Sequence, residues 1–91
     1  MTTAHTQIPW DKDAQEKYNR MIVRIPLFHR TIADKVAHKR AELNAHERGA
    51  SVVEESDIVR AFLTEVPMAF YSLMIKIMND VGFNYQPYEK E

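Results

Sequence analysis

Apolar residues recur at helical spacing along most of this chain, and the pattern predicts helices rather than strands. A first helix is expected after Pro9, with Asp11 as its N-terminal cap. We expect it to end near Arg24 or Ile25, because the residue before Pro26 avoids the helical region. Its apolar stripe comprises Ala14, Tyr18, Met21, Ile22 and Ile25.

A second, longer helix is predicted from Pro26 to Arg48. Proline suits the first position of a helix, and Gly49 is the expected C-terminal stop. Large apolar residues lie on one face of this helix, and a row of alanines lies on another. Small side chains allow a neighbouring helix to approach closely, so the alanine row predicts a tight helix contact. The large residues are Phe28, Ile32, Val36 and Leu43, and the alanines are Ala33, Ala37, Ala41 and Ala45.

The segment 50–53 is short and β-prone, so we expect it to be extended. A third helix should follow it and end at Pro67. Glu54 and Glu55 favour its start, because negative charge is stabilised at a helix N-terminus. Its inward-facing residues are expected to be Ile58, Ala61, Phe62 and Val66.

The last predicted helix, from Met68 to Val81 and closed by Gly82, is apolar on most of its circumference. Its polar strip is narrow, and a helix of this kind must be buried on most sides. A small bundle cannot easily cover all of it, so we expect a partner chain or self-association at this helix. The residues predicted to bind a partner here are Phe70, Tyr71, Met74, Ile75, Ile77 and Met78.

These elements predict an all-α fold, a small bundle of three to four helices with a short extended segment near residues 50–53. The chain of 91 residues suits one domain with a modest core. Its predicted parts are a flexible lead at 1–9, a helical domain at 10–66, an apolar C-terminal helix at 67–82 and an irregular tail at 83–91.

Composition removes several classes of function. There is no cysteine, which excludes disulfides, thiolate metal sites and Fe–S ligation within the chain. The first ten residues lack the basic and apolar regions of a signal peptide. No stretch approaches the about 20 apolar residues of a spanning helix, which argues against membrane insertion. We therefore expect a cytoplasmic protein.

No catalytic residue is predicted, and we expect a protein that is not an enzyme. Glu54, Glu55 and Asp57 form an acidic cluster, but paired-carboxylate chemistry needs groups that converge on one pocket. At a helix start these three are expected to point into solvent. The chain has only two glycines, Gly49 and Gly82, so it has no glycine-rich phosphate loop.

The histidines of the long helix predict no metal site and no cofactor. His29, His38 and His46 are nine and eight residues apart, so they point in three directions on one helix. The simplest interpretation is exposed histidines paired with neighbouring carboxylates. His29 is kept as a candidate axial ligand to a tetrapyrrole ring held by a partner.

Charge argues against a nucleic-acid partner. The net charge is −1, with +3 over residues 24–48 and −4 over 49–91. The basic residues of the long helix are interrupted by Glu42 and Glu47, and the pI is about 6.4. A long helix followed by the segment from Gly49 to Phe62 nevertheless resembles histone-fold proteins. A histone-like DNA-binding homodimer is therefore the alternative function.

A second resemblance covers residues 9–62. Trp10 and Ala14, the hexapeptide IPLFHR at 25–30, the helix ending at Gly49 and the segment ASVVEESDIVRA at 50–61 resemble one small helical domain. That domain forms the C-terminus of the B subunit of light-independent protochlorophyllide reductase and also occurs in stand-alone proteins. Val53 stands where the family tends to place a threonine helix cap, and the last helix has no counterpart.

In the reductase this domain is an appendage, and the Fe–S ligands and most of the substrate pocket lie elsewhere. The resemblance therefore implies a small non-catalytic accessory subunit that docks onto a larger redox, tetrapyrrole or photosynthetic assembly, such as one that makes bacteriochlorophyll. It places the family surface on the long helix, where Phe28 and Arg30 join the predicted partner-binding residues.

Overall fold

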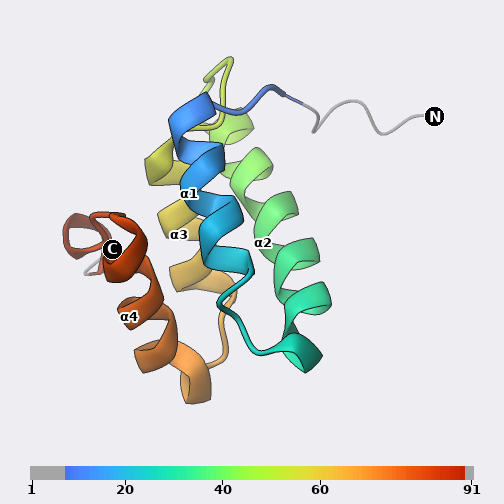
Figure 1. Cartoon of the computed structure of the whole chain (residues 1–91). Coiled ribbons are helices and arrows are strands. Elements are labelled where there is room, and N and C mark those ends of the chain that lie inside the picture. Colours follow the sequence, from blue (N-terminus) through green and yellow to red (C-terminus); the bar gives the residue numbers. More distant parts are fainter. Residues whose placement is uncertain (1–7, 90–91) are drawn as a thin grey trace.

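The computed structural model describes residues 8–89, and within that range it contains four α-helices and no strand. This confirms the all-α class (Figure 1). Most of the predicted lead at 1–9 lies outside the described residues. The helices are α1 (Lys12–Ile22), α2 (Leu27–Glu47), α3 (Glu55–Glu65) and α4 (Tyr71–Val81), with short 3₁₀ helices η2 (Met68–Phe70) before α4 and η3 (Gln86–Tyr88) after it.

The helix ends lie at the residues that local chemistry favours. The Asp11 carboxylate accepts a hydrogen bond of 3.0 Å from the Ala14 N–H and so caps α1. Pro26 immediately precedes α2. Gly82 follows α4 with φ of 93°, a left-handed conformation that glycine adopts without steric cost. The segment that was expected to be irregular after Gly82 contains η3.

The segment before α3 is extended and pairs with the start of the chain. The Val53 N–H donates to the Pro9 carbonyl, and the Asp11 N–H donates to the Val53 carbonyl, both at 2.8 Å. Trp10 and Val53 thereby form an isolated parallel bridge. Both backbone groups of Val53 are thus satisfied within the chain.

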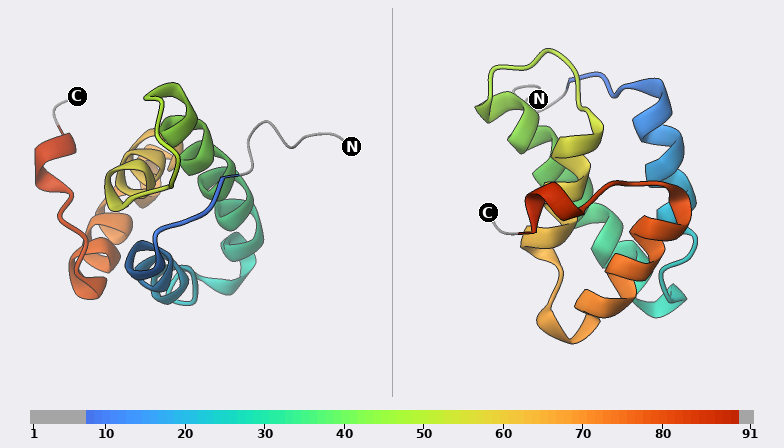
Figure 2. Two further views of the ribbon diagram at one scale, coloured as in Figure 1. Left: turned by 90° about the horizontal axis from the view of Figure 1, so that it is seen from above. Right: turned by 90° about the vertical axis from the view of Figure 1, so that its left-hand side faces the viewer.

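Helix α3 is the centre of the bundle, with α1, α2 and α4 around it (Figure 2). Its most extensive contact is with α2. On α2 this contact uses the alanine row, because Ala37, Ala41 and Ala45 are all buried. The small side chains bring the two helices together, as the sequence predicts.

The structure corrects the expectation for the last helix. Met74, Ile77 and Met78 were predicted to bind a partner, but they are only 4%, 4% and 0% exposed. They belong to the same core as Tyr18, Met21 and Phe62 of the other helices. The bundle covers them because α4 packs against both α1 and α3. The other three predicted residues on this segment, Phe70, Tyr71 and Ile75, are half-buried.

The turn between α1 and α2 and the turn between α3 and α4 lie at the same end of the molecule, the lower end in Figure 1. The loop from α2 to α3 lies at the opposite end, next to the segment that leads into α1. The lower end therefore brings residues near 23–28 close to residues near 65–70. The candidate site lies there.

Candidate functional site

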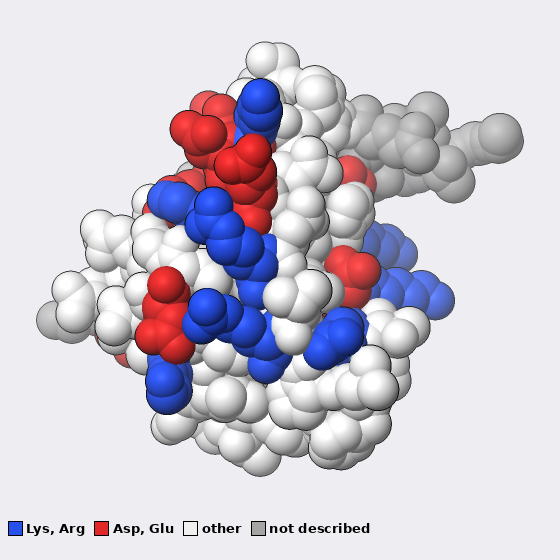
Figure 3. Space-filling view, in the orientation of Figure 1, with Lys and Arg blue, Asp and Glu red and all other residues white. Residues whose placement is uncertain are grey.

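Large apolar side chains are exposed at the lower end of the bundle. Phe28 is 80% exposed, Ile32 68% and Met68 85%. Figure 3 shows this lower end as a surface without charged side chains. The structure thus contains the uncovered apolar surface that was expected on the last helix, but most of it belongs to α2. We call Leu27, Phe28, Ile32, Val36 and Met68 the apolar face.

Helical geometry explains why α2 exposes these residues. Successive residues turn by about 100°, so residues four apart drift slowly around the helix and form one stripe. Phe28, Ile32 and Val36 form such a stripe. The alanine row that contacts α3 lies on a different side of α2, so the stripe cannot reach the core. We call these three residues the ridge.

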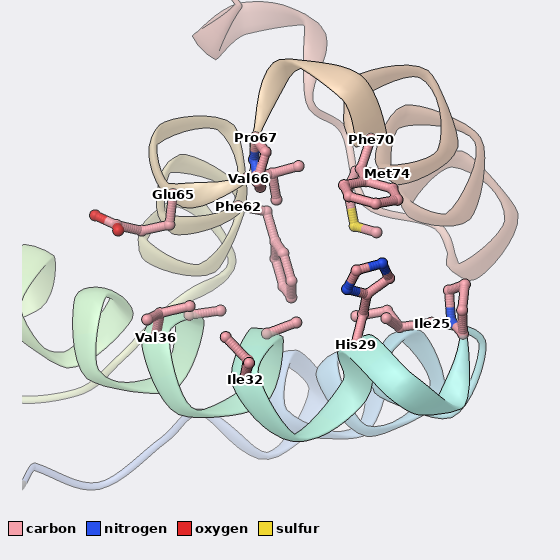
Figure 4. Close-up of a pocket in the computed structure, with 13 residues that line it drawn as sticks. Ile25, His29, Ile32, Val36, Phe62, Glu65, Val66, Pro67, Phe70 and Met74 are labelled. Atoms are coloured by element: carbon pink, nitrogen blue, oxygen red, sulfur yellow. The ribbon is translucent and has the colours of Figure 1, made fainter.

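A groove borders the ridge and encloses about 240 Å³. One wall is α2, including His29, Ile32 and Val36. The opposite wall is the corner between α3 and α4, including Val66, Pro67 and Phe70, while the buried ring of Phe62 lies between the walls (Figure 4). The lining is almost wholly apolar, and its titratable side chains are those of His29 and Glu65.

His29 lies inside this groove rather than free in solvent. Its ring contacts the edge of Phe70, with centroids 4.4 Å apart, and packs near Phe28 at 4.2 Å. Figure 4 shows the imidazole directed across the groove toward Phe70 and Met74. The half-buried ring therefore helps to hold α2 against the α3–α4 corner, and its role as an axial ligand stays a prediction.

Arg30, predicted to bind a partner, contacts its own chain. Its guanidinium donates to the Val23 carbonyl at 2.9 Å and to the Ile25 carbonyl at 3.1 Å and 3.3 Å. These carbonyls lie at the end of α1 and in the turn after it. The side chain therefore fixes the turn between α1 and α2, and so the position from which Phe28 projects.

Charged residues flank the apolar face with opposite sign on its two sides. Glu65 lies on the far wall of the groove. Lys35 and Lys39 lie on the other side of α2, where they line a second, shallower hollow with His38 and Glu42. All three flanking residues are exposed. Among the described residues, no ion pair involves Lys35, Lys39 or Glu65.

The acidic cluster at the start of α3 is also corrected by the structure. Asp57 does not point into solvent but is 0% exposed, and its carboxylate accepts two hydrogen bonds from Arg48. The bonds to this carboxylate raise the pKa of the Arg48 guanidinium. Asp57 also accepts from the Glu54 N–H at 2.9 Å and so caps α3. Glu55 pairs with Lys17 at 3.0 Å.

A second polar cluster joins α1 to α2; the sequence predicts its histidine–carboxylate pair, His38 with Glu42, but not the contacts of Trp10 and Tyr18. The Trp10 indole N–H donates to Glu42 at 3.0 Å, and the same carboxylate oxygen is 3.1 Å from Nε2 of His38. Trp10 stacks on His38 at 4.6 Å. The Tyr18 hydroxyl donates to both the carboxylate and the carbonyl of Asp34. Burial, and then the neighbouring Asp34, raise the pKa of Tyr18.

The described residues form neither a metal-binding cluster nor a single membrane-spanning helix. Residues 8–89 hold no group of three or more His, Asp or Glu side chains that could bind a metal ion. In the same range no single helix is long and apolar enough to cross a membrane. The segments Glu55–Glu65 and Met68–Val81 meet that length and composition only together, and they are bent by 120°.

Comparison of the chain with protein-family models, with curated proteins and with solved structures gives no match.

Proposed function

We propose that this chain is a small non-catalytic accessory subunit that works by protein–protein contact within a larger assembly. The observation that carries the proposal is the apolar face, which residues 8–89 leave uncovered beside an apolar groove. Contiguous exposed apolar surface on a small domain marks an interaction site. The aromatic anchor Phe28 is of the kind that dominates binding energy at interfaces.

The arrangement of polar groups favours contact over chemistry. The carboxylates that are best organised, Asp57 and Glu42, are each occupied by partners within the chain. The groove holds two titratable side chains, His29 and Glu65, in an apolar lining. Such a groove supplies shape and burial rather than a nucleophile with its base.

The kind of assembly is proposed from the sequence resemblance. A redox or tetrapyrrole-handling complex would be the host, and residues 25–30 would provide part of the family surface. In the fold this hexapeptide forms the turn and first residues of α2, where Arg30 fixes the turn and Phe28 projects from it. The resemblance and the exposed apolar face thus point to the same end of the molecule.

Affinity purification of the full chain from its source cell tests this function. The tagged wild-type chain should retain a stoichiometric protein that belongs to a redox or pigment-handling complex. The variant Phe28→Ser/Ile32→Ser should lose it, whereas the matched control Glu16→Ser/Arg20→Ser on the exposed side of α1 should keep it. Equal retention by all three chains, or recovery of no protein at all, would contradict the proposal.

The histone-like alternative has its own test in the same preparation. Duplex DNA binding that weakens steeply with added salt would support it, because released counterions drive such binding. The structure offers this alternative less support. Lys35 and Lys39 are a small basic patch for binding DNA. The backbone of Val53, in the segment that resembles histone folds, already forms hydrogen bonds with Pro9 and Asp11 of its own chain and so does not pair with a second copy.

A further inference from the structure

We propose that two copies of this chain pair through the apolar face, with the ridge of each copy seated in the groove of the other. The inference rests on the proposed function in one respect, namely that this face is a protein contact. It goes further because it names the neighbour at that face as a second copy. The larger assembly would then receive the chain as a pair.

The shapes of the ridge and the groove support this pairing. Ile32 and Val36 are exposed and also line the groove, so the ridge and the groove run side by side along α2. The ridge extends over the eight residue steps from Phe28 to Val36, or about 12 Å at about 1.5 Å per step. A two-fold axis in the plane of the face and parallel to α2 places each ridge over the other copy's groove. Such self-complementarity is what a two-fold interface requires.

The charges at the two edges of the apolar face also support this pairing. Across the face the order is basic residues, ridge, groove and acidic residue. Lys35 and Lys39 flank the ridge on the side away from the groove, and Glu65 lies on the far wall of the groove. The rotation that seats ridge in groove also brings Lys35 and Lys39 of one copy to Glu65 of the other. At both edges of the paired faces, basic side chains of one copy then lie opposite the acidic side chain of the other.

The same order of charges argues against other occupants. An anionic lipid surface favours cations around the apolar residues, but one edge of this face is acidic. An unrelated helix would have to carry an apolar stripe with acid on one side and base on the other. This chain already presents that combination on its own face.

A charge swap tests the pairing with the full chain in analytical ultracentrifugation. The wild type should sediment as a dimer that dissociates on dilution. Lys35→Glu/Lys39→Glu and Glu65→Lys should each raise the dimer dissociation constant at least about tenfold, because like charges then meet at both edges. Mixing these two variants should restore a dimer, since each copy then supplies the charge that the other needs.

Folding is checked by circular dichroism, and the substitutions are mild. Lys and Glu have similar helix propensity, and Lys suits the C-terminal end of α3, where Glu65 lies. The control Lys12→Glu/Arg20→Glu makes the same change in net charge on α1 and should leave the dimer intact. A monomeric wild type, a dimer that survives in both single-edge variants, or a mixture that stays monomeric would overturn the pairing.

These outcomes are separable from those of the proposed function. A monomeric wild-type chain that still captures a redox or pigment-handling complex through Phe28 and Ile32 would remove the pairing and keep the accessory role. A dimer that follows the charge swap but captures no complex would keep the pairing and remove the accessory role.

Discussion

The guanidinium of Arg48, at the end of α2, and the carboxylate of Asp57, in the first turn of α3, form two parallel hydrogen bonds of 2.8 Å and 2.7 Å. The carboxylate is fully buried, whereas the arginine side chain is 34% exposed. Asp57 also accepts from the Glu54 N–H. One carboxylate therefore joins the two helices across the loop and caps the second of them.

Replacing Asp57 with alanine should lower the free energy of unfolding by about 3–5 kcal/mol, because removal of one partner leaves buried polar groups without their bonds. Urea denaturation measures the change. Asp80→Ala is the matched control, because the Asp80 carboxylate is likewise paired with basic side chains, those of Arg24 and Lys76, but lies at the surface. Its loss should cost at most about 1 kcal/mol. Equal effects of the two substitutions would contradict the assigned role of Asp57.

Tyr18 should make stability depend on alkaline pH. Burial and the Asp34 carboxylate raise its pKa in the folded chain above the about 10 of an unfolded tyrosine. The stabilisation is therefore complete below about pH 10 and is lost as the pH rises, because the unfolded chain gives up its proton first. Denaturation of wild type and Tyr18→Phe across this range should show a stability difference that shrinks with rising pH. A constant difference would show that Tyr18 ionises equally in both states.

The helices themselves follow from the sequence because their signals are local. Asp11, Pro26 and Gly82 act within a few residues of their own positions, so each end can be assigned from chemistry that the sequence displays. The row of Ala37, Ala41 and Ala45 likewise predicts a close helix contact. Its partner, α3, is the next helix along the chain.

The apolar surface could not be placed in the same way, because exposure depends on which elements cover which. The last helix is apolar on most sides, yet α1 and α3 together cover Met74, Ile77 and Met78. The ridge of α2 has ordinary helical spacing but receives no covering element within the described residues. The Arg48–Asp57 pair was missed for a related reason, since burial of an acidic residue is decided by tertiary packing.

The contact between α2 and α3 should not tolerate a larger side chain. Ala41 is 0% exposed in the middle of the alanine row, so Ala41→Leu adds volume within the buried contact between the two helices. We expect a loss of about 1–3 kcal/mol in the free energy of unfolding, measured by thermal or urea denaturation. His46→Leu, at an exposed position of the same helix away from the ridge and the groove, is the control. A leucine accommodated at both positions without loss would mean that the helices are not tightly packed there.

Arg30 should matter for stability more than for binding. Its guanidinium bonds the carbonyls of Val23 and Ile25, and Ile25 is only 1% exposed. Arg30→Ala leaves a buried carbonyl with one partner fewer, so we expect a cost of about 1–2 kcal/mol in urea denaturation. Arg20→Ala, at an exposed position of α1, should be nearly neutral. A weakened dimer with unchanged stability would instead assign Arg30 to the interface.

The ridge should show the opposite separation of stability from association. Phe28 and Ile32 are 80% and 68% exposed, so the single chain gains little from burying them. Phe28→Ser/Ile32→Ser should therefore change the free energy of unfolding of the monomer, measured at high dilution, by no more than about 0.5 kcal/mol at either position. The same variant should abolish the sedimenting dimer, since burial of these side chains would supply most of the association energy. Phe62→Ala, at the buried floor of the groove, should instead cost about 3–5 kcal/mol in the monomer. A ridge variant as unstable as Phe62→Ala would show that the ridge is part of the core in solution, and the apolar face would then not be a free surface.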